Sequence, residues 1–191
     1  MHKIFTHKYF WPLLTFLLTI PSILFLLRPN TYYNMHDDMQ MIRQLEMEKC
    51  LKDGQIPCRW TPDLGYGYGY PLFNFYPPMP YLVGQFYRTF GLSYVASIKA
   101  TAVTQILLSS LFMYLLGTSI FGQMGGFISS LFYTYAPYHA LNVFVRGAMN
   151  EAWAAVFFPL IFYFSRLLVI KKDIKNLICL SLAFTGLLLS H

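Results

Sequence analysis

The sequence predicts an all-α integral membrane protein with about five transmembrane helices and a large outer loop between the first two. The composition is one reason, because 56% of the residues are hydrophobic and only 12% are charged, whereas a soluble domain carries roughly a quarter charged residues. The apolar runs are the other, because several approach the roughly 20 residues that cross a hydrocarbon core about 30 Å thick. We therefore treat residues 1–191 as a single membrane domain.

The net charge of +6 could indicate a nucleic-acid-binding protein, but the placement of the basic residues argues against it. They form no stripe with interleaved aromatic residues, and many lie at the ends of the apolar runs. Membrane topology explains that placement. We therefore expect membrane lipids as partners and no nucleic acid.

Five apolar runs are the predicted spans, at residues 10–27, 95–116, 119–138, 152–170 and 174–190. Arg28-Pro29 follows the first run where a signal peptide would carry small residues at a cleavage site, so this run is expected to be an uncleaved helix. Lys99 lies near one end of the second run, where its long stem can reach the membrane interface.

Small residues recur along one face of the third run. Gly122, Gly126 and Ser130 follow one another at four-residue spacing. In a membrane helix this spacing is typical of a face that packs closely against a neighbouring helix. We therefore expect the third run to lie against another span.

Two groups of lysines, one before the first run and one around the loop between the last two, set the predicted orientation. They comprise Lys3, Lys8, Lys171, Lys172 and Lys175. If the helices alternate, both groups fall on one side, and the positive-inside rule makes that side cytoplasmic. The N-terminus of this multi-pass protein is then cytoplasmic, while the loop 28–94 reaches the outer face.

The stretch MHDDMQMIRQLE, which begins at Met35, places two adjacent carboxylates beyond the first span. Asp37 or Asp38 could simply cap a short helix running to about Lys52, since Asp37 and Gln40 have the spacing of a capping box. An acidic pair directly after a membrane helix could also meet a lipid-borne substrate at the interface. The two interpretations can both hold.

The segment GQIPCRWTPDLGYGYGYPLFNFYPPMPY, residues 54–81, is rich in glycine, proline and aromatic residues. Its glycines allow unusual backbone angles and close approach of a ligand, while its prolines prevent a continuous helix. It could anchor the chain in the headgroup layer or contact substrate, and we favour the second, with Tyr68 and Tyr70 as substrate-binding residues. Cys50 and Cys58 could form a disulfide in an oxidising compartment, although their spacing does not establish it.

The stretch YHALNVFVRGAMNEAWA, residues 138–154, places Arg146 and Glu151 between two spans. An arginine fork suits phosphate oxygens. An ion pair between the two side chains, or an arginine at lipid headgroups, would explain the pattern equally well. With alternating helices these residues and the final His191 reach the same outer face as the acidic pair.

Three segments together resemble a family of bacterial multi-pass membrane proteins described as related to 6-pyruvoyl-tetrahydropterin synthase: HDD at 36–38, DGQIPCRWTPDLGYGYGYPLFNFYPP at 53–78 and VRGAMNEAWAAVFFPL at 145–160. The glycine-tyrosine-proline block is the specific part of the resemblance. The description implies no pterin chemistry here, since the sequence has no zinc-binding histidine cluster. In architecture the family resembles the type C (GT-C) glycosyltransferases.

That resemblance implies transfer of a sugar from a polyprenyl-phosphate carrier at the outer face of the bacterial plasma membrane. Asp37 or Asp38 would act as general base toward the acceptor hydroxyl or would bind a metal. Arg146 is then the candidate for the phosphate, with His36 or Glu151 orienting its neighbours. Two adjacent carboxylates could hold a divalent metal, but they are too few to specify one, and the sequence fixes no cofactor.

The alternatives are a non-catalytic membrane scaffold and a transporter component. A transporter predicts ionisable residues near the midplane of the helices, and the predicted spans contain almost none. Members of the superfamily usually have more membrane helices, and this chain stops at Ser190-His191 within an apolar run. We therefore expect an N-terminal portion of a longer transferase, or else an inactive truncated fragment.

Overall fold

The computed structural model describes residues 9–29 and 31–191, and these residues form helices and loops without strands. The helices are α2 (Phe10–Ile23), α3 (Gln40–Lys52), α4 (Leu72–Phe75), α5 (Met79–Thr89), α6 (Tyr94–Thr134), α7 (Pro137–Ala140), the π-helix η1 (Leu141–Arg146), α8 (Met149–Lys171) and α9 (Ile174–Leu188). The predicted all-helical class is confirmed. Lys3 and Lys8, on which the predicted orientation partly depends, lie outside the described residues.

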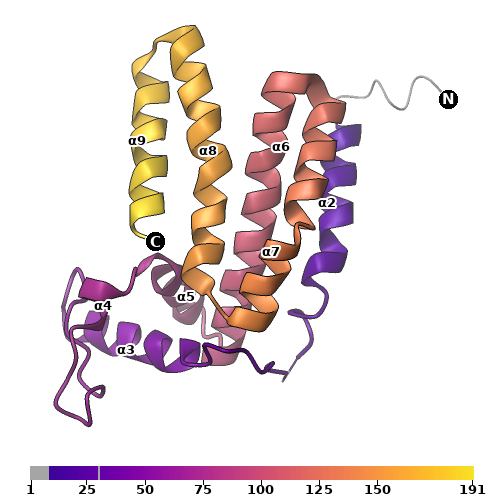
Figure 1. Cartoon of the computed structure of the whole chain (residues 1–191). Helices are drawn as coiled ribbons and strands as arrows, with labels where there is room; N and C mark the ends of the chain where they lie inside the picture. The colour runs from indigo at the N-terminus through magenta and orange to yellow at the C-terminus, as the bar shows by residue number, and fades with distance from the viewer. Residues whose placement is uncertain (1–8, 30) are drawn as a thin grey trace.

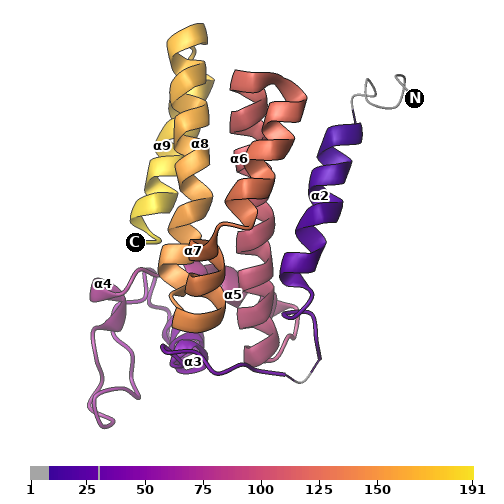
Figure 2. The same ribbon diagram turned by 45° about the vertical axis from the view of Figure 1, so that its right-hand side comes forward.

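The helices form two groups that run in different directions. In Figures 1 and 2, α2, α6, α8 and α9 run along one common direction as a bundle, while α3, α4 and α5 lie at one end of it. We call residues 31–93, which contain α3 to α5, the end layer. The connections α7 and η1 and the last residue lie near this end, whereas the turn between α8 and α9 lies at the opposite end.

Helix α6 consists of two arms, because Gly122 has a φ of 76° and interrupts the helix. The second arm returns beside the first (Figure 1). A Cβ on Gly117 would lie 2.9 Å from the Cα of Gly126, so glycine permits this close approach. Ser130 donates a 2.7 Å hydrogen bond to the carbonyl of Ser110. Gly126 and Ser130 therefore form the predicted packing face, whereas Gly122 is the turn.

Fewer helices qualify as membrane spans than the five predicted. Among the described helices, α6 and α8 are long and apolar enough to cross a membrane. Helices α2 and α9 have 14 and 15 residues, below the roughly 20 residues of a full span. The predicted run 10–27 is wrong at its end, because α2 stops at Ile23. The predicted run 119–138 is wrong at both ends, because the second arm of α6 begins after Gly122 and ends at Thr134.

The end layer is fastened internally by polar contacts and a disulfide. Tyr81, which is fully buried, donates a 2.6 Å hydrogen bond to Gln40, and Arg88 donates a 2.7 Å bond to Glu48. The Arg88 bond lowers the pKa of the Glu48 carboxyl to about 2, although burial opposes the shift. Cys50 and Cys58, left open by their spacing, are disulfide-bonded.

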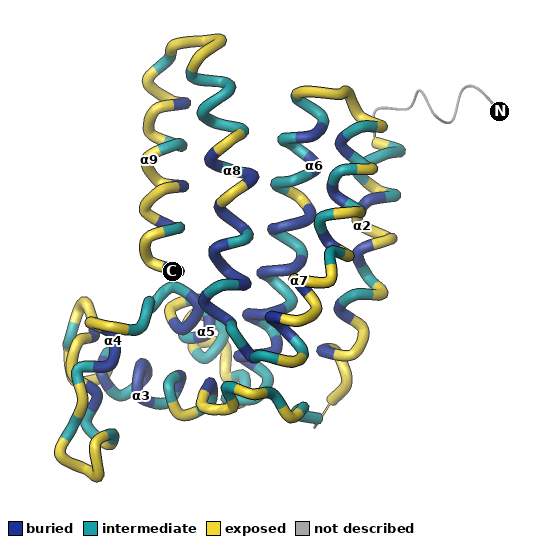
Figure 3. Tube along the Cα trace, viewed as in Figure 1, coloured by how far each residue is buried: buried dark blue, intermediate teal, exposed yellow. Residues whose placement is uncertain are grey.

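The outward faces of the bundle expose many large apolar side chains. On α9 these are Ile174, Leu177, Ile178, Leu182, Phe184 and Leu188. Figure 3 shows the same helix largely exposed along its length, while α8 is buried along much of its end-layer half. Contiguous exposed apolar surface of this kind is unusual on a soluble monomer and marks contact with lipid or with another protein.

Candidate functional site

A cavity of about 490 Å³ lies where the end layer meets the start of α8. Its lining residues are His36, Asp37, Phe75, Tyr76, Pro77, Arg146, Ala148, Asn150, Glu151 and His191. They come from three stretches that are far apart in the sequence and from the last residue. Four predicted site residues, His36, Asp37, Arg146 and Glu151, therefore line one cavity.

Backbone hydrogen bonds hold the acidic segment against the arginine segment. The N–H of His36 donates to the carbonyl of Val145 and that of Asp37 to the carbonyl of Arg146, both at 2.9 Å. The Gln40 side chain adds a 2.7 Å bond to the carbonyl of Gly147. These bonds fix Asp37 beside the segment that carries Arg146.

Gly147 makes this approach sterically possible. Its φ is 66°, in the left-handed region that glycine adopts without penalty. A Cβ on Gly147 would also lie 2.7 Å from the carbonyl oxygen of Asp37, closer than real Cβ atoms come to such atoms. A side chain at this position would therefore push the two segments apart.

The Asp37 carboxylate is a hydrogen-bonded group in the cavity wall and does not cap a helix. Helix α3 begins at Gln40 and its N-cap is Met39, with no side-chain cap bond, so the predicted capping by Asp37 or Asp38 is wrong. Arg43 and Tyr76 donate to Asp37 Oδ2 at 2.6 and 3.0 Å. No described residue hydrogen-bonds its Oδ1.

The two partners of Asp37 are held in defined protonation states by their surroundings. Burial opposes the charge of Arg43, but its hydrogen bond to Asp37 and the neighbouring tyrosines raise its pKa above the ordinary value. Burial also raises the pKa of Tyr76, although the Arg43 charge lowers it. Tyr76 therefore keeps its proton at neutral pH and acts as a donor to Asp37.

Arg146 and Glu151 form a bidentate ion pair at the other side of the cavity. The two guanidinium nitrogens Nη1 and Nη2 each donate a 2.6 Å hydrogen bond to a different Glu151 oxygen. Tyr138 donates to Glu151 at 2.7 Å, and Asn142 accepts from Arg146 at 2.8 Å. The bond to Glu151 raises the pKa of Arg146. Of the alternatives that the sequence left open for Arg146, the structure contains the ion pair with Glu151.

The π-helix η1 brings Arg146 into this position. It ends at Arg146 and is followed directly by the left-handed residue Gly147. Single π-helical turns of this kind occur frequently at functional sites. The pair is part-exposed, with 41% of the Arg146 side chain and 25% of the Glu151 side chain accessible, so a solute in the cavity can reach it.

Asn150 adds an unsatisfied polar group to the cavity wall. It is 6% exposed, and its Nδ2 donates a 2.7 Å hydrogen bond to the carbonyl of Pro77. Its Oδ1 is buried without a hydrogen-bond partner among the described residues. Burying such a group without a partner costs free energy.

Three predicted site residues lie outside the cavity. Asp38 is exposed and does not line it. Tyr68 and Tyr70 belong to a loop closed by the backbone bridge between Thr61 and Tyr70, and Tyr68 is 88% exposed. The predicted unusual backbone angles are confirmed at the glycines of this loop, where Gly65 has a φ of 63°.

The sequence interpretation missed Arg43, Tyr76 and Asn150. Only the fold shows that Asn150 lines the cavity and that Arg43, outside the lining, hydrogen-bonds Asp37. Tyr76 belongs to the proline-rich block, where it is one of many aromatic residues. Among the described residues, no group of three or more His, Cys, Asp or Glu side chains could hold a metal ion.

No family model, no curated protein and no solved structure matches this chain. The resemblance to the pterin-synthase-related membrane family and to type C glycosyltransferases therefore stays a prediction. The interpretation of the cavity rests on its own residues and geometry.

Proposed function

We propose that this chain is a multi-pass protein of the bacterial plasma membrane, with its N-terminus in the cytoplasm and the end layer on the outer face. The exposed apolar faces of the bundle suit contact with lipid. Lys171, Lys172 and Lys175 lie around the turn between α8 and α9, far from the end layer. The disulfide within the end layer suits an oxidising compartment. The first observation supports the membrane placement, and the other two support the orientation.

We further propose that the cavity belongs to a glycosyltransferase-like protein that transfers a sugar from a polyprenyl-phosphate carrier. One observation carries the proposal: a carboxylate, Asp37, and an arginine fork, Arg146, line a single cavity at the end of the bundle. Sugar transfer needs both groups, because the acceptor must lose a proton and the leaving phosphate must be stabilised.

In this proposal Asp37 accepts the proton of the acceptor hydroxyl through Oδ1, while Arg43 and Tyr76 hold Oδ2 in place. The acceptor oxygen forms a bond to the anomeric carbon, and the bond from that carbon to the phosphate oxygen breaks. Arg146 stabilises the phosphate that leaves. His36 lies beside the acceptor.

The Glu151 carboxylate competes with phosphate for the Arg146 fork. Nη1 and Nη2 of that fork both donate to Glu151, and Nη1 also donates to Asn142. Phosphate binding therefore requires the pair to open or to share the guanidinium. Tyr138 also donates to Glu151, so this carboxylate keeps a partner when Arg146 turns to the phosphate.

The proposal is tested by measuring the binding of undecaprenyl phosphate to the purified full chain. We expect Arg146→Gln to weaken binding by about tenfold or more, since a charge-assisted bond is lost. Glu151→Gln should strengthen binding, because it frees the fork. Arg59→Gln is the matched control, since Arg59 is an exposed arginine of the end layer that does not line the cavity.

The scaffold alternative predicts another result. If Arg146 and Glu151 only fasten η1 to α8, both substitutions lower the unfolding temperature and leave the affinity for undecaprenyl phosphate unchanged. That outcome, or equal weakening by Arg59→Gln, would remove the proposed phosphate contact.

A further inference from the structure

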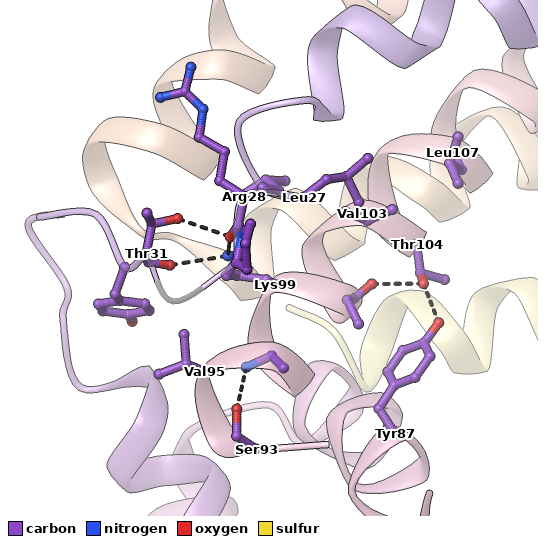
Figure 4. Close-up of a pocket in the computed structure, with 15 residues that line it drawn as sticks. Leu27, Arg28, Thr31, Tyr87, Ser93, Val95, Lys99, Val103, Thr104 and Leu107 are labelled. Atoms are coloured by element: carbon purple, nitrogen blue, oxygen red, sulfur yellow. Dashed lines mark hydrogen bonds between the residues drawn. The ribbon is translucent and has the colours of Figure 1, made fainter. Parts of the chain in front are cut away.

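A second and larger cavity, of about 790 Å³, lies between the end of α2 and the first arm of α6. It shares no lining residue with the cavity of Asp37 and Arg146. Figure 4 shows its lining residues, which come from the chain after α2, from α5 and from the start of α6. We call it the α2–α6 groove.

The polar end of the α2–α6 groove is positively charged. Lys99 is 8% exposed, and its ammonium group donates to the backbone carbonyls of Arg28 and Thr31. An ammonium group has three N–H donors, so one remains for a ligand. The lining contains no aspartate or glutamate among the described residues. The charges of Asp37 and Asp38 act on Tyr32 of the lining from outside the groove.

The start of α6 adds to this positive potential. Ser93 caps the helix, and Ser93, Val95 and Ala96 all line the groove. The N-terminus of a long helix carries a partial positive charge that favours anions. Arg28 lies at the rim, where its guanidinium extends away from Lys99 (Figure 4) and stands 5.3 Å from the Phe25 ring centre.

The other end of the groove is apolar. One face of α6 supplies Ala100, Val103 and Leu107, and the chain after α2 supplies Leu26 and Leu27. Ala96 and Ala100, four residues apart on α6, are small and leave room above the helix. The groove therefore offers a cation at the level of the end layer and an apolar wall that runs into the bundle.

We propose that the α2–α6 groove binds an anionic phospholipid of the surrounding bilayer. Its phosphate accepts a hydrogen bond from Lys99 at the start of α6, and one acyl chain lies along Val103 and Leu107. The charge of the groove and its apolar wall match the two parts of such a lipid. The inference rests on the proposed membrane placement but not on sugar transfer.

The test is native mass spectrometry of the full chain purified in a mild detergent, with phosphatidylglycerol or phosphatidylcholine of identical acyl chains added. We expect the protein to retain phosphatidylglycerol preferentially. Lys99→Met should reduce the retained lipid by about tenfold, as expected for one charge-assisted bond. Lys175→Met, which removes an equivalent charge outside the groove, should leave retention unchanged.

A second variant keeps the test informative if Lys99→Met destabilises the junction of α2 and α6. Ala100→Phe fills the groove without changing its charge and should also reduce retention. Equal retention of both lipids by the wild-type protein would overturn the proposal, as would retention that survives either groove substitution or is lost equally in Lys175→Met.

Glycerol phosphate serves as a headgroup without acyl chains. If glycerol phosphate displaces phosphatidylglycerol at equal concentration, the apolar wall adds nothing to the binding affinity, and the assignment of the groove to a lipid is wrong. Arg146→Gln alters only the first cavity and Lys99→Met only this groove, so failure of one proposal can be told from failure of the other.

Discussion

Two regions at the end-layer side of the protein are rich in side chains that could contact a substrate, and they are built in opposite ways. The cavity wall joins segments about a hundred residues apart, through backbone bonds from His36 and Asp37 to Val145 and Arg146. The loop 61–70 is closed on itself by the Thr61–Tyr70 bridge. Tyr66 and Tyr68 in this loop point into solvent, with Tyr68 88% exposed.

This difference shows what makes a site in this protein. Both regions carry polar or aromatic side chains, but only the first encloses a volume and opposes a carboxylate to an arginine fork. A local loop can present side chains, whereas a cavity needs segments that come together from different elements. Paired substitutions, one in the cavity wall and one in the loop or outside the cavity, test whether the two regions differ in their effect on activity and stability.

The largest expected effect separates the two adjacent carboxylates. We expect Asp37→Asn to lower the rate of sugar transfer from a polyprenyl-phosphate donor by about 10²-fold or more, the usual contribution of a general base. Asp38→Asn should change it little, since Asp38 does not line the cavity. Transfer of a radiolabelled sugar, normalised to folded protein, measures both. Equal losses would contradict the distinction.

The second comparison concerns two left-handed glycines. Gly67→Ala should cost about 1 kcal/mol, because φ is 86° but no atom lies within 4 Å of the new Cβ. Gly147→Ala should cost about 3 kcal/mol, since strain is joined by collision with the Asp37 carbonyl. Thermal unfolding in detergent measures the difference. Equal shifts would mean that the cavity wall is no tighter than the loop.

The third prediction concerns α3, which connects the two regions. The pKa of Glu48 is lowered from 4.5 to about 2, so its stabilisation is fully present above pH 4.5 and is lost as the pH falls toward 2. We expect the free energy of unfolding to fall by on the order of 1–3 kcal/mol between pH 6 and pH 2 through this group. In Glu48→Gln that part of the pH dependence should be absent. If the variant keeps the pH profile of the wild-type protein, the predicted contribution of Glu48 is contradicted.

The smallest effect compares two tyrosine hydroxyls. Tyr76→Phe removes one of the two donors to Asp37 Oδ2 and should cost about 1 kcal/mol of stability. The transfer rate should fall as well, because the carboxylate is less well held. Tyr68→Phe should have no measurable effect. Chemical unfolding and transfer assays on both variants check this. A larger effect of Tyr68→Phe would contradict the assignment of the cavity, and not the loop 61–70, as the substrate site.

The local features of the fold were largely predictable from sequence. Helix α3 ends at Lys52 with Gly54 beyond it, as expected from propensity and a left-handed glycine. The grouping of His36, Asp37, Arg146 and Glu151 at one end also followed from alternating helices. The exact ends of α2 and α9 did not, because apolar residues continue past the point where the helix stops.

The remaining site residues depend on long-range contacts that periodicity does not encode. Asn150 reaches Pro77, and Arg43 shares a hydrogen-bond partner with Tyr76. The choice between Asp37 and Asp38 also needed the fold, since adjacent side chains point in different directions. The sequence placed Lys99 near the end of a span, but only the fold shows that it is 8% exposed and donates to the carbonyls of Arg28 and Thr31.

The most direct test of the central claim is photo-crosslinking with undecaprenyl phosphate. A photoreactive phenylalanine analogue would replace Phe75, which is 75% exposed and lines the cavity, or Tyr68, which is 88% exposed and does not. We predict a lipid adduct, detected by mass spectrometry, at position 75 and not at position 68. No adduct at 75, or equal adducts at both positions, would contradict the assignment of the cavity as the substrate site.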